Sequence, residues 1–361
     1  MGAAAARRVR LALRGDPRAE DPQPLVTNGW VLDLVERVGA AARGATVSVA
    51  LGSADPGDPG RQAETVATWC RLTGNELVEV RDGVATVRRG RSPDPLAELD
   101  PGQLPGTRLW MYTNFDCNLA CDYCCARSSP RAARRELGRD RVRQLAAEAV
   151  DAGVTELILT GGEPFLLPDI GELVAACTTL LPTTLLTNGM LFRGRRLDAL
   201  RGMDRTRLAV QVSLDSATSE AHDRHRGRGS WDRAVSGIHT ARAEGFRVKV
   251  AATLPPGQSH ELDPFHDFLD TLGIARDDQV IRALAHQGFA EHGLELTVES
   301  LIPEVTVTAD GVYWHPVSAN DPDQLVTREL FPLGAAITEV RRRFAEQRAR
   351  ATAAAQWFPC A

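Results

Sequence analysis

The chain has 361 residues, 43% of them hydrophobic and 25% charged, with a formal net charge of −5. This length fits one large domain with a smaller one, and the charge balance gives no basic footprint for nucleic acid or an anionic membrane. No apolar run approaches the roughly 20 residues that span a bilayer, and the N-terminus lacks the apolar stretch of an export signal. We therefore expect a cytoplasmic protein with no nucleic acid or membrane partner, whose clustered cysteines bind metal rather than form disulfides.

Residues 1–90 are predicted to form a small βαβαββ domain. Two segments carry apolar residues at helical spacing and end at a glycine, and the segments between them read as strands. Arg81, Asp82 and Gly83 form the turn of a hairpin between the last two strands. The expected strands are 9–15, 45–51, 75–80 and 84–90, and the expected helices are 29–44 and 60–74. Residues 91–106 are rich in proline and glycine and are expected to be a linker.

Strands and helices alternate from residue 107 to residue 290. Six such βα units predict a parallel sheet, either open or curved into a partial barrel. The expected strands are 108–115, 156–164, 183–189, 207–215, 246–254 and 279–285, with helices between them such as 139–152 and 231–244. The segment 291–361 differs, because it contains a predicted hairpin that turns at Asp310 and Gly311, followed by an amphipathic helix over 331–351.

Four of the seven cysteines lie within residues 117–125. Burial as small hydrophobic residues suits Cys70 and Cys177, but not this polar loop after a strand. A structural zinc site would need a fourth ligand from another close cysteine or histidine, and Cys125 directly follows Cys124 and cannot easily bind the same ion. Three thiolates at C-x3-C-x2-C spacing predict instead a [4Fe–4S] cluster with one iron open to a substrate or cofactor. Cys125 is then expected to be a buried free thiol.

The segment CNLACDYCC resembles the C-x3-C-x-aromatic-C signature of radical S-adenosylmethionine (SAM) enzymes, in particular the MoaA/PqqE/SPASM-like subgroup. Three further motifs match in the same order: LTGGEP after the second strand, LLTNG after the third, and VQVSLD with HRGRGSW after the fourth. The resemblance covers about residues 107–290 and implies an α/β fold with a partial (β/α)6 barrel of the TIM type. The polar signatures all fall at the carboxyl ends of predicted strands, where such barrels place their active sites.

The resemblance also assigns roles to particular residues. Cys117, Cys121 and Cys124 would hold the cluster, and the GGEP motif would hold the amino group of SAM. A hydroxyl and a guanidinium fork suit a carboxylate, so Ser213 and Arg226 would contact the carboxylate and ribose of SAM. The full set of expected SAM-binding residues is Tyr123, near the adenine, with Gly161, Gly162, Glu163, Pro164, Asn188, Ser213, Asp215 and Arg226.

The activity implied by the resemblance is reductive cleavage of SAM to a 5′-deoxyadenosyl radical, which modifies a peptide or a cofactor precursor. An electron donor such as flavodoxin or ferredoxin would be a partner. Arg282, His286 and His315 are candidate catalytic residues in the substrate pocket. Two alternatives stay open: a sulfur-inserting radical SAM enzyme, and an iron–sulfur scaffold without catalysis.

The two ends of the chain carry weaker resemblances. Residues 1–90 resemble TusA/SirA-like sulfur-carrier domains, but Asp21 stands where those place their nucleophilic cysteine, which implies a docking or substrate-positioning module. Residues 291–361 resemble a degenerate SPASM-like extension. No cysteine occurs between Cys177 and Cys360, so no full auxiliary cluster is expected, and no role is assigned to Cys360.

Overall fold

The structure is a computed structural model that describes residues 29–51, 59–90, 96, 99–255 and 262–357. The chain forms two compact units, Leu99–Ala349 and Met1–Glu98 with Arg350–Ala361. The expected strand over 9–15, the segment around Asp21, and Cys360 lie outside the described residues. Within the described part of the chain, no helix is long and apolar enough to cross a membrane.

In its described residues, the first unit packs helices α2 and α3 against a small sheet. Its elements are α2 (Gly29–Ala40), β1 (Thr46–Ala50), α3 (Pro59–Thr73), β2 (Glu76–Arg81) and β3 (Val84–Arg88). The strand order is β1-β3-β2 and both pairings are antiparallel. The predicted hairpin turn is confirmed, because Asp82 and Gly83 both have the positive φ that a tight two-residue hairpin turn requires.

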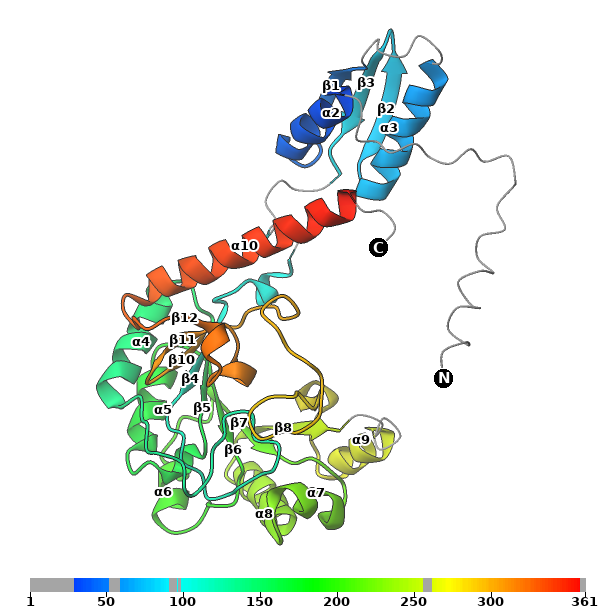
Figure 1. The fold of residues 1–361 in the computed structure, drawn as a ribbon. Helices are drawn as coiled ribbons and strands as arrows, with labels where there is room; N and C mark the ends of the chain where they lie inside the picture. The colour runs from blue at the N-terminus through cyan, green and yellow to red at the C-terminus, as the bar shows by residue number, and fades with distance from the viewer. Residues whose placement is uncertain (1–28, 52–58, 91–95, 97–98, 256–261, 358–361) are drawn as a thin grey trace. The chain divides into compact units, whose positions relative to one another are not determined.

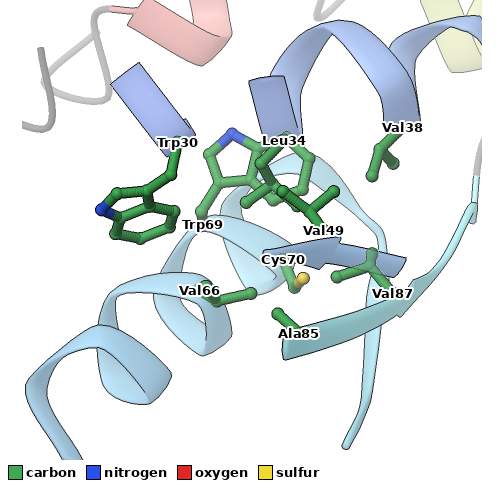
Figure 2. Close-up of a cluster of buried hydrophobic side chains, with 9 residues drawn as sticks. All are labelled: Trp30, Leu34, Val38, Val49, Val66, Trp69, Cys70, Ala85 and Val87. Atoms are coloured by element: carbon green, nitrogen blue, oxygen red, sulfur yellow. The ribbon is translucent and has the colours of Figure 1, made fainter. Parts of the chain in front are cut away.

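The core of the first unit centres on aromatic residues from its two helices (Figure 2). Trp30 of α2 and Trp69 of α3 are both buried beside Cys70, which is 2% exposed. Burial raises the pKa of the Cys70 thiol to about 11, so this cysteine behaves as a small hydrophobic side chain, as its sequence context predicts.

The second unit is built on a nine-stranded sheet with the order β12-β11-β10-β4-β5-β6-β7-β8-β9 (Figure 1). Strands β4 to β9 are all parallel and confirm the six predicted βα units. The bounds are β4 (Arg108–Tyr112), β5 (Glu156–Thr160), β6 (Thr183–Thr187), β7 (Leu208–Ser213), β8 (Arg247–Leu254), β9 (Gln279–Ala283), β10 (Thr306–Thr308), β11 (Gly311–Tyr313) and β12 (Leu325–Thr327).

Helices connect the parallel strands and cover the outer face of the sheet (Figure 1). They are α4 (Arg139–Asp151), α5 (Ile170–Thr178), α6 (Arg195–Arg201), α7 (Ser219–Arg226), α8 (Ser230–Ala243) and α9 (Leu262–Thr271). A further helix, α10 (Leu333–Trp357), follows β12. Short 3-10 helices are η2 (Pro101–Gln103), η3 (Pro164–Leu166), η5 (Arg276–Asp278), η6 (Pro316–Ser318) and η7 (Pro322–Gln324). Strands β9 and β12 stay at separate edges, so within the described residues the sheet is a partial barrel and not a closed one.

The C-terminal segment extends this sheet instead of forming a separate cover. The predicted hairpin exists as β10 and β11, and β10 pairs in parallel with β4. Without β10, the backbone groups of β4 would form an open edge, which proteins commonly cover. The expected linker also differs in part, because Pro105 and Gly106 are buried in the second unit and Arg341 of α10 donates a hydrogen bond to the Pro105 carbonyl at 2.8 Å.

Candidate functional site

The cysteine loop, residues 113–128 after β4, is fixed by the end of β5. Asn114 is fully buried, and its side-chain amide donates to the carbonyl oxygens of Asp116 and Glu163, both at 3.1 Å. The N–H groups of Gly162 and Glu163 donate in return to the carbonyls of Asn114 and Asp116, both at 3.0 Å. A Cβ atom on Gly161 would overlap Asn114, and one on Gly162 would overlap the backbone of Asp116. The GGEP glycines therefore let β5 approach the cysteine loop closely.

The three predicted cluster ligands lie together in this loop. Cys117 is 8% exposed, and Cys121 and Cys124 are half-buried. Backbone N–H groups of Leu119 and Ser128 donate to the sulfur atoms of Cys117 and Cys124, both at 3.4 Å. Burial raises the pKa of Cys117 to about 12 and that of Cys121 to about 11, and charges on neighbouring thiols raise them further.

This donor set fits a cluster better than a single ion. Among the described residues, no three His, Cys, Asp or Glu side chains are close enough to hold one metal ion. A [4Fe–4S] cluster binds each thiolate to a different iron and so separates the sulfur atoms more widely. Burial raises the pKa of the Cys117 and Cys121 thiols, and bound iron would offset the cost of their ionisation.

Glu163 ties the ends of β5 and β6 together. Its carboxylate is fully buried and accepts hydrogen bonds from the N–H of Phe165 at 3.0 Å, the Thr187 hydroxyl at 2.8 Å and the N–H of Asn188 at 2.8 Å. Burial raises the pKa of Glu163, against the effect of these donors. Pro164 begins η3 beside it and is also buried. Both carboxylate oxygens of Glu163 therefore already accept hydrogen bonds from the protein. A contact from GGEP to the SAM amino group stays a prediction.

Asn188 joins the third strand to the cysteine loop. Its side-chain amide donates to Asn118 Oδ1 at 2.8 Å, and its own Oδ1 accepts the Met190 N–H at 3.0 Å. Ser213 is the last residue of β7, and its hydroxyl has no hydrogen-bond partner within the part of the chain that the structure describes. The predicted residues therefore lie at one edge of the sheet. Among them, the Ser213 hydroxyl is free to accept or donate a hydrogen bond to a ligand.

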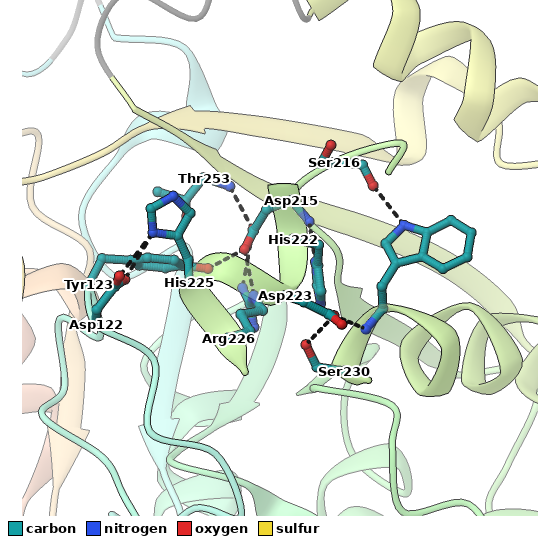
Figure 3. Close-up of polar contacts among 11 residues, drawn as sticks. Asp122, Tyr123, Asp215, Ser216, His222, Asp223, His225, Arg226, Ser230 and Thr253 are labelled. Atoms are coloured by element: carbon teal, nitrogen blue, oxygen red, sulfur yellow. Dashed lines mark hydrogen bonds and ion pairs between the residues drawn. The ribbon is translucent and has the colours of Figure 1, made fainter. Parts of the chain in front are cut away.

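Asp215, Arg226 and Tyr123 form a buried polar triad (Figure 3). The Arg226 guanidinium donates to both Asp215 oxygens, at 2.5 and 3.2 Å, and the Tyr123 hydroxyl donates to the same carboxylate. The N–H of Thr253, on β8, adds a bond at 3.1 Å. Burial opposes ionisation of Asp215, but the Arg226 charge and these hydrogen bonds outweigh it and lower the pKa of Asp215.

This triad changes the role expected of Arg226. In the sequence-based prediction, Arg226 contacts SAM directly. In the structure its guanidinium is paired with Asp215 and lies 5.5 Å from the centre of the Tyr123 ring. Arg226 therefore holds Tyr123 and Asp215 through contacts within the protein, and its direct contact with SAM stays a prediction. The pairing joins the cysteine loop to α7, which are far apart along the chain, so no local sequence pattern reveals this contact.

A cavity of about 320 Å³ lies beside this triad. One wall comes from Asp122 and Tyr123 of the cysteine loop, and another from the loop that follows β9. Its full lining is Asp122, Tyr123, Asp215, Ser216, Ala221, Arg224, His225, Thr253, Pro255, Leu284, Phe289, Ala290, Glu291 and His292. Its size and its mix of apolar and polar walls suit a small organic ligand.

The loop that follows β9, residues 284–294, is fastened directly to the cysteine loop. The N–H of Phe289 donates to the Cys124 carbonyl at 3.1 Å, and Arg127 Nε donates to the Gly288 carbonyl at 3.1 Å. Gly288 has a φ of +68°, and a Cβ atom there would overlap the Cys124 carbonyl oxygen. The same loop supplies Leu284, Phe289 and Ala290 to the cavity, so it links the cavity wall to a cluster ligand.

Replacing Gly288 with alanine is expected to weaken SAM binding about tenfold, or about 1.4 kcal/mol, because the added methyl group pushes the cavity wall off the cysteine loop. Gly153→Ala is the matched control, since Gly153 has a φ of +78° and open space around its Cβ position. Equilibrium SAM binding and the electron paramagnetic resonance spectrum of the reduced cluster report the effect. Equal SAM affinity of the two variants would show that backbone strain at a positive φ, and not overlap with the Cys124 carbonyl, weakens SAM binding.

His222 makes the stability of this site dependent on pH. It is 1% exposed, and its Nδ1 accepts the Asp215 N–H at 3.1 Å. Burial, and then the charge of Arg226, lower the pKa of His222 from 6.5 to about 4. Its contribution to stability is therefore complete above pH 6.5 and is lost as the pH falls toward 4.

We expect this loss to reach about 3 kcal/mol between those two pH values. His222→Asn should remove most of the slope, because an asparagine oxygen can accept the same N–H without titrating. Urea unfolding of both proteins across this pH range measures the difference. An identical slope in the variant would assign the acid sensitivity to another group.

The three candidate catalytic residues do not come together. His286 lies in the loop after β9, where its Nδ1 pairs with Glu295 at 2.5 Å on the surface with 43% of its side chain exposed. In this structure it lies at the surface, and a catalytic role for it stays a prediction. Arg282, on β9, and His315, before η6, interact electrostatically, and burial with the charges of Arg282 and Arg108 lowers the pKa of His315 to about 4.

Sequence reasoning missed some residues that build the site. Asn114 and Asn118 organise the cysteine loop, and His222 supports Asp215. Asn114 had a detectable signal, since it is a polar residue at the end of the first strand, next to the cysteines. His222 had no such signal in the sequence, because its hydrogen bond with the Asp215 N–H forms only in the folded chain.

An open parallel βα sheet with three thiols at its carboxyl edge, beside a ligand-sized cavity, defines a cofactor-dependent barrel enzyme. The model of the Radical SAM superfamily matches residues 111–301, and the chain belongs to this family. Enzymes of this family use a [4Fe–4S] cluster and SAM. The match lies outside residues 1–90, so the sulfur-carrier resemblance of that segment stays a prediction.

Named relatives match part of the chain. The PqqA peptide cyclase of Rhizobium meliloti is 33% identical over 208 residues, which are 56% of this chain and 54% of that protein. The AdoMet-dependent heme synthase of Methanosarcina barkeri is 32% identical over 159 residues, 44% of this chain and 45% of that protein. The chain thus spans about half the length of these relatives. The structure of native anSMEcpe with bound AdoMet superposes with a TM-score of 0.50 at 14% identity, covering 66% of this chain and 82% of that one, and supports the fold alone.

Proposed function

We propose that this protein cleaves SAM reductively and uses the resulting radical to modify a peptide. The observation that carries the proposal is the cysteine loop, which carries the three thiols and contributes Asp122 and Tyr123 to the wall of a cavity of about 320 Å³. When bound, the cluster and SAM supply a 5′-deoxyadenosyl radical that abstracts a hydrogen atom from the substrate. The protein supplies the positions of the reacting groups and keeps water away from them.

The residues around the cavity have different roles in binding SAM. Tyr123 and the apolar side chains of Leu284 and Phe289 offer surfaces for the adenine ring. Ser213 offers a free hydroxyl to the polar end of SAM. Arg226 and Asp215 hold Tyr123 in place, so they act on SAM through its orientation.

A peptide is favoured as the substrate because the alignment with the PqqA peptide cyclase extends over 208 residues, 56% of this chain. The similarity to a heme synthase keeps a small cofactor precursor as the competing class. We assign the first unit to substrate docking, since it forms its own compact unit with its own hydrophobic core. A flavodoxin or ferredoxin in the cytoplasm would provide the electron.

Substrate-dependent SAM cleavage tests this proposal. An extract of cells that carry the gene is separated by size into a peptide fraction and a small-molecule fraction. Each fraction is added to the reconstituted enzyme with dithionite and SAM, and 5′-deoxyadenosine is measured. We expect the peptide fraction to increase its rate of formation and protease treatment to remove the increase. Stimulation by the small-molecule fraction alone would overturn the peptide assignment.

A further inference from the structure

Arg135 lies against the start of the cysteine loop. It belongs to the segment that follows this loop and is tied back to it, because the Cys117 N–H donates to the Ser129 carbonyl at 3.3 Å. The Arg135 guanidinium lies 3.8 Å from the centre of the Phe115 ring, and Phe115 is 1% exposed. A guanidinium stacked on an aromatic ring is held by a cation–π interaction. One face of the Arg135 guanidinium therefore covers the residues that lead into Cys117.

The edge of the same guanidinium contacts the segment 310–320, which begins at the turn of the β10–β11 hairpin, at two points. Its Nη1 forms an ion pair with Asp310, and 35% of each of these two side chains is exposed. Its Nη2 donates to Asn320 Oδ1 at 2.9 Å. The Asn320 side-chain amide in turn donates to the Ala126 carbonyl, inside the cysteine loop. Arg135 thus connects the hairpin to both ends of the cysteine loop.

A small buried cluster of side chains supports this connection. Its members come from β4, the cysteine loop and the segment 310–320, and they are Tyr112, Phe115, Ala126 and Ala319. Cys124 packs against this cluster. Ala319 directly precedes Asn320, so the apolar contact and the hydrogen bond to Ala126 act at the same place. The segment 310–320 therefore packs against the part of the loop that carries Cys124.

The turn after Ala126 makes hydrogen bonds to Cys124 itself. The Arg127 N–H donates to the Cys124 carbonyl at 3.0 Å, and the Ser128 N–H donates to its sulfur atom at 3.4 Å. The Ala126 carbonyl and the Arg127 N–H belong to one planar peptide unit, so the hydrogen bond from Asn320 fixes the orientation of both. Hydrogen bonds to a cluster sulfur stabilise the more negative, reduced cluster and so raise its reduction potential.

We propose that Arg135, acting through Asn320, is a positioning residue for Cys124, and that the segment 310–320 thereby sets how easily the cluster is reduced. The inference rests on the proposed function, in which Cys124 is a cluster ligand. No cysteine occurs between Cys177 and Cys360. The segment 310–320 therefore serves the cluster by holding its loop and not by supplying a ligand.

The reduction potential of the reconstituted cluster, followed by electron paramagnetic resonance during a redox titration, tests this role. Arg135→Gln and Asn320→Ala are each expected to lower the potential, because the Ser128 N–H is no longer held against the Cys124 sulfur. Arg135→Gln removes a positive charge and Asn320→Ala keeps it, so a shift in both variants cannot come from charge alone. A competing chelator should also remove iron about tenfold more easily from both, as expected when an outer partner of a metal ligand is lost.

Arg134→Gln is the matched control, because Arg134 is the neighbouring residue, is exposed and carries the same charge. A wild-type potential in Asn320→Ala, or equal shifts in Arg135→Gln and Arg134→Gln, would overturn the positioning role. If Arg135→Gln fails to fold, Asn320→Ala decides alone, since it leaves the ion pair with Asp310 in place. A wild-type protein whose cluster shows this dependence but which never cleaves SAM would instead contradict the proposed function and leave the positioning role standing.

Discussion

Cys121→Ala is expected to abolish the iron–sulfur cluster and all SAM cleavage, whereas Cys125→Ala retains both. The two thiols lie close together in one loop, but only Cys121 belongs to the C-x3-C-x2-C set. Cys121 interacts electrostatically with Arg226, Cys124 and Asp215. Cys125 interacts with Tyr112 and Arg282 on the inner side of the barrel. A cluster held by three thiolates cannot keep full iron occupancy when one ligand is lost.

The two variants are compared after anaerobic reconstitution by their iron and sulfide content and by their formation of 5′-deoxyadenosine. The first unit has its own core, so its circular dichroism contribution and its unfolding should be unchanged in Cys121→Ala. Full iron in Cys121→Ala, or loss of iron in Cys125→Ala, would contradict the assignment of the ligands.

Asp215→Asn is expected to lower the free energy of unfolding of the second unit by about 3–5 kcal/mol and to weaken SAM binding strongly. Only 7% of the Asp215 side chain and 11% of the Arg226 side chain are exposed. The amide keeps the shape of the carboxylate but leaves the Arg226 charge buried without compensation. The Tyr123 hydroxyl loses its charged acceptor at the same time, so the cavity wall loses its fixed orientation.

Asp122→Asn is the matched control for this prediction. Asp122 lines the same cavity and pairs with His225 at 3.0 Å, but 58% of its side chain is exposed. An exposed pair of this kind contributes less than about 1 kcal/mol, so the control should be nearly as stable as the wild type. Urea unfolding and equilibrium SAM binding compare the two. Similar losses of stability and SAM affinity in both variants would show that the buried Asp215–Arg226 pair contributes no more than the exposed Asp122–His225 pair.

Most of the barrel could be predicted because local sequence specifies it. Each of the strands β4 to β7 is a short, mostly buried run followed by a polar motif, and parallel strands bring those motifs to one edge. Leu157 and Leu159 of β5 are fully buried, and GGEP follows directly. Pattern and topology together therefore predict that the cysteine loop, Glu163, Asn188 and Ser213 lie near one another.

The remaining features depend on contacts between distant parts of the chain. Strand β10 has three residues, and only its pairing with β4, far earlier in the chain, makes it part of the sheet. The pairing of Arg226 with Asp215, and the contact of Asp215 with Tyr123, join α7 to the cysteine loop and could not be read from local sequence. His286 resembled a pocket residue in sequence, but the bridge between Ala285 and Leu294 turns the loop so that it pairs with Glu295 at the surface.

The central claim is that three thiols of the cysteine loop hold one [4Fe–4S] cluster at which SAM is cleaved. The most direct test is to reconstitute the protein anaerobically with iron and sulfide, add dithionite and SAM, and quantify iron, sulfide and 5′-deoxyadenosine. We predict about four irons per chain and formation of 5′-deoxyadenosine. A protein that binds this iron but forms no 5′-deoxyadenosine, even in the presence of the stimulating peptide fraction, would contradict the account.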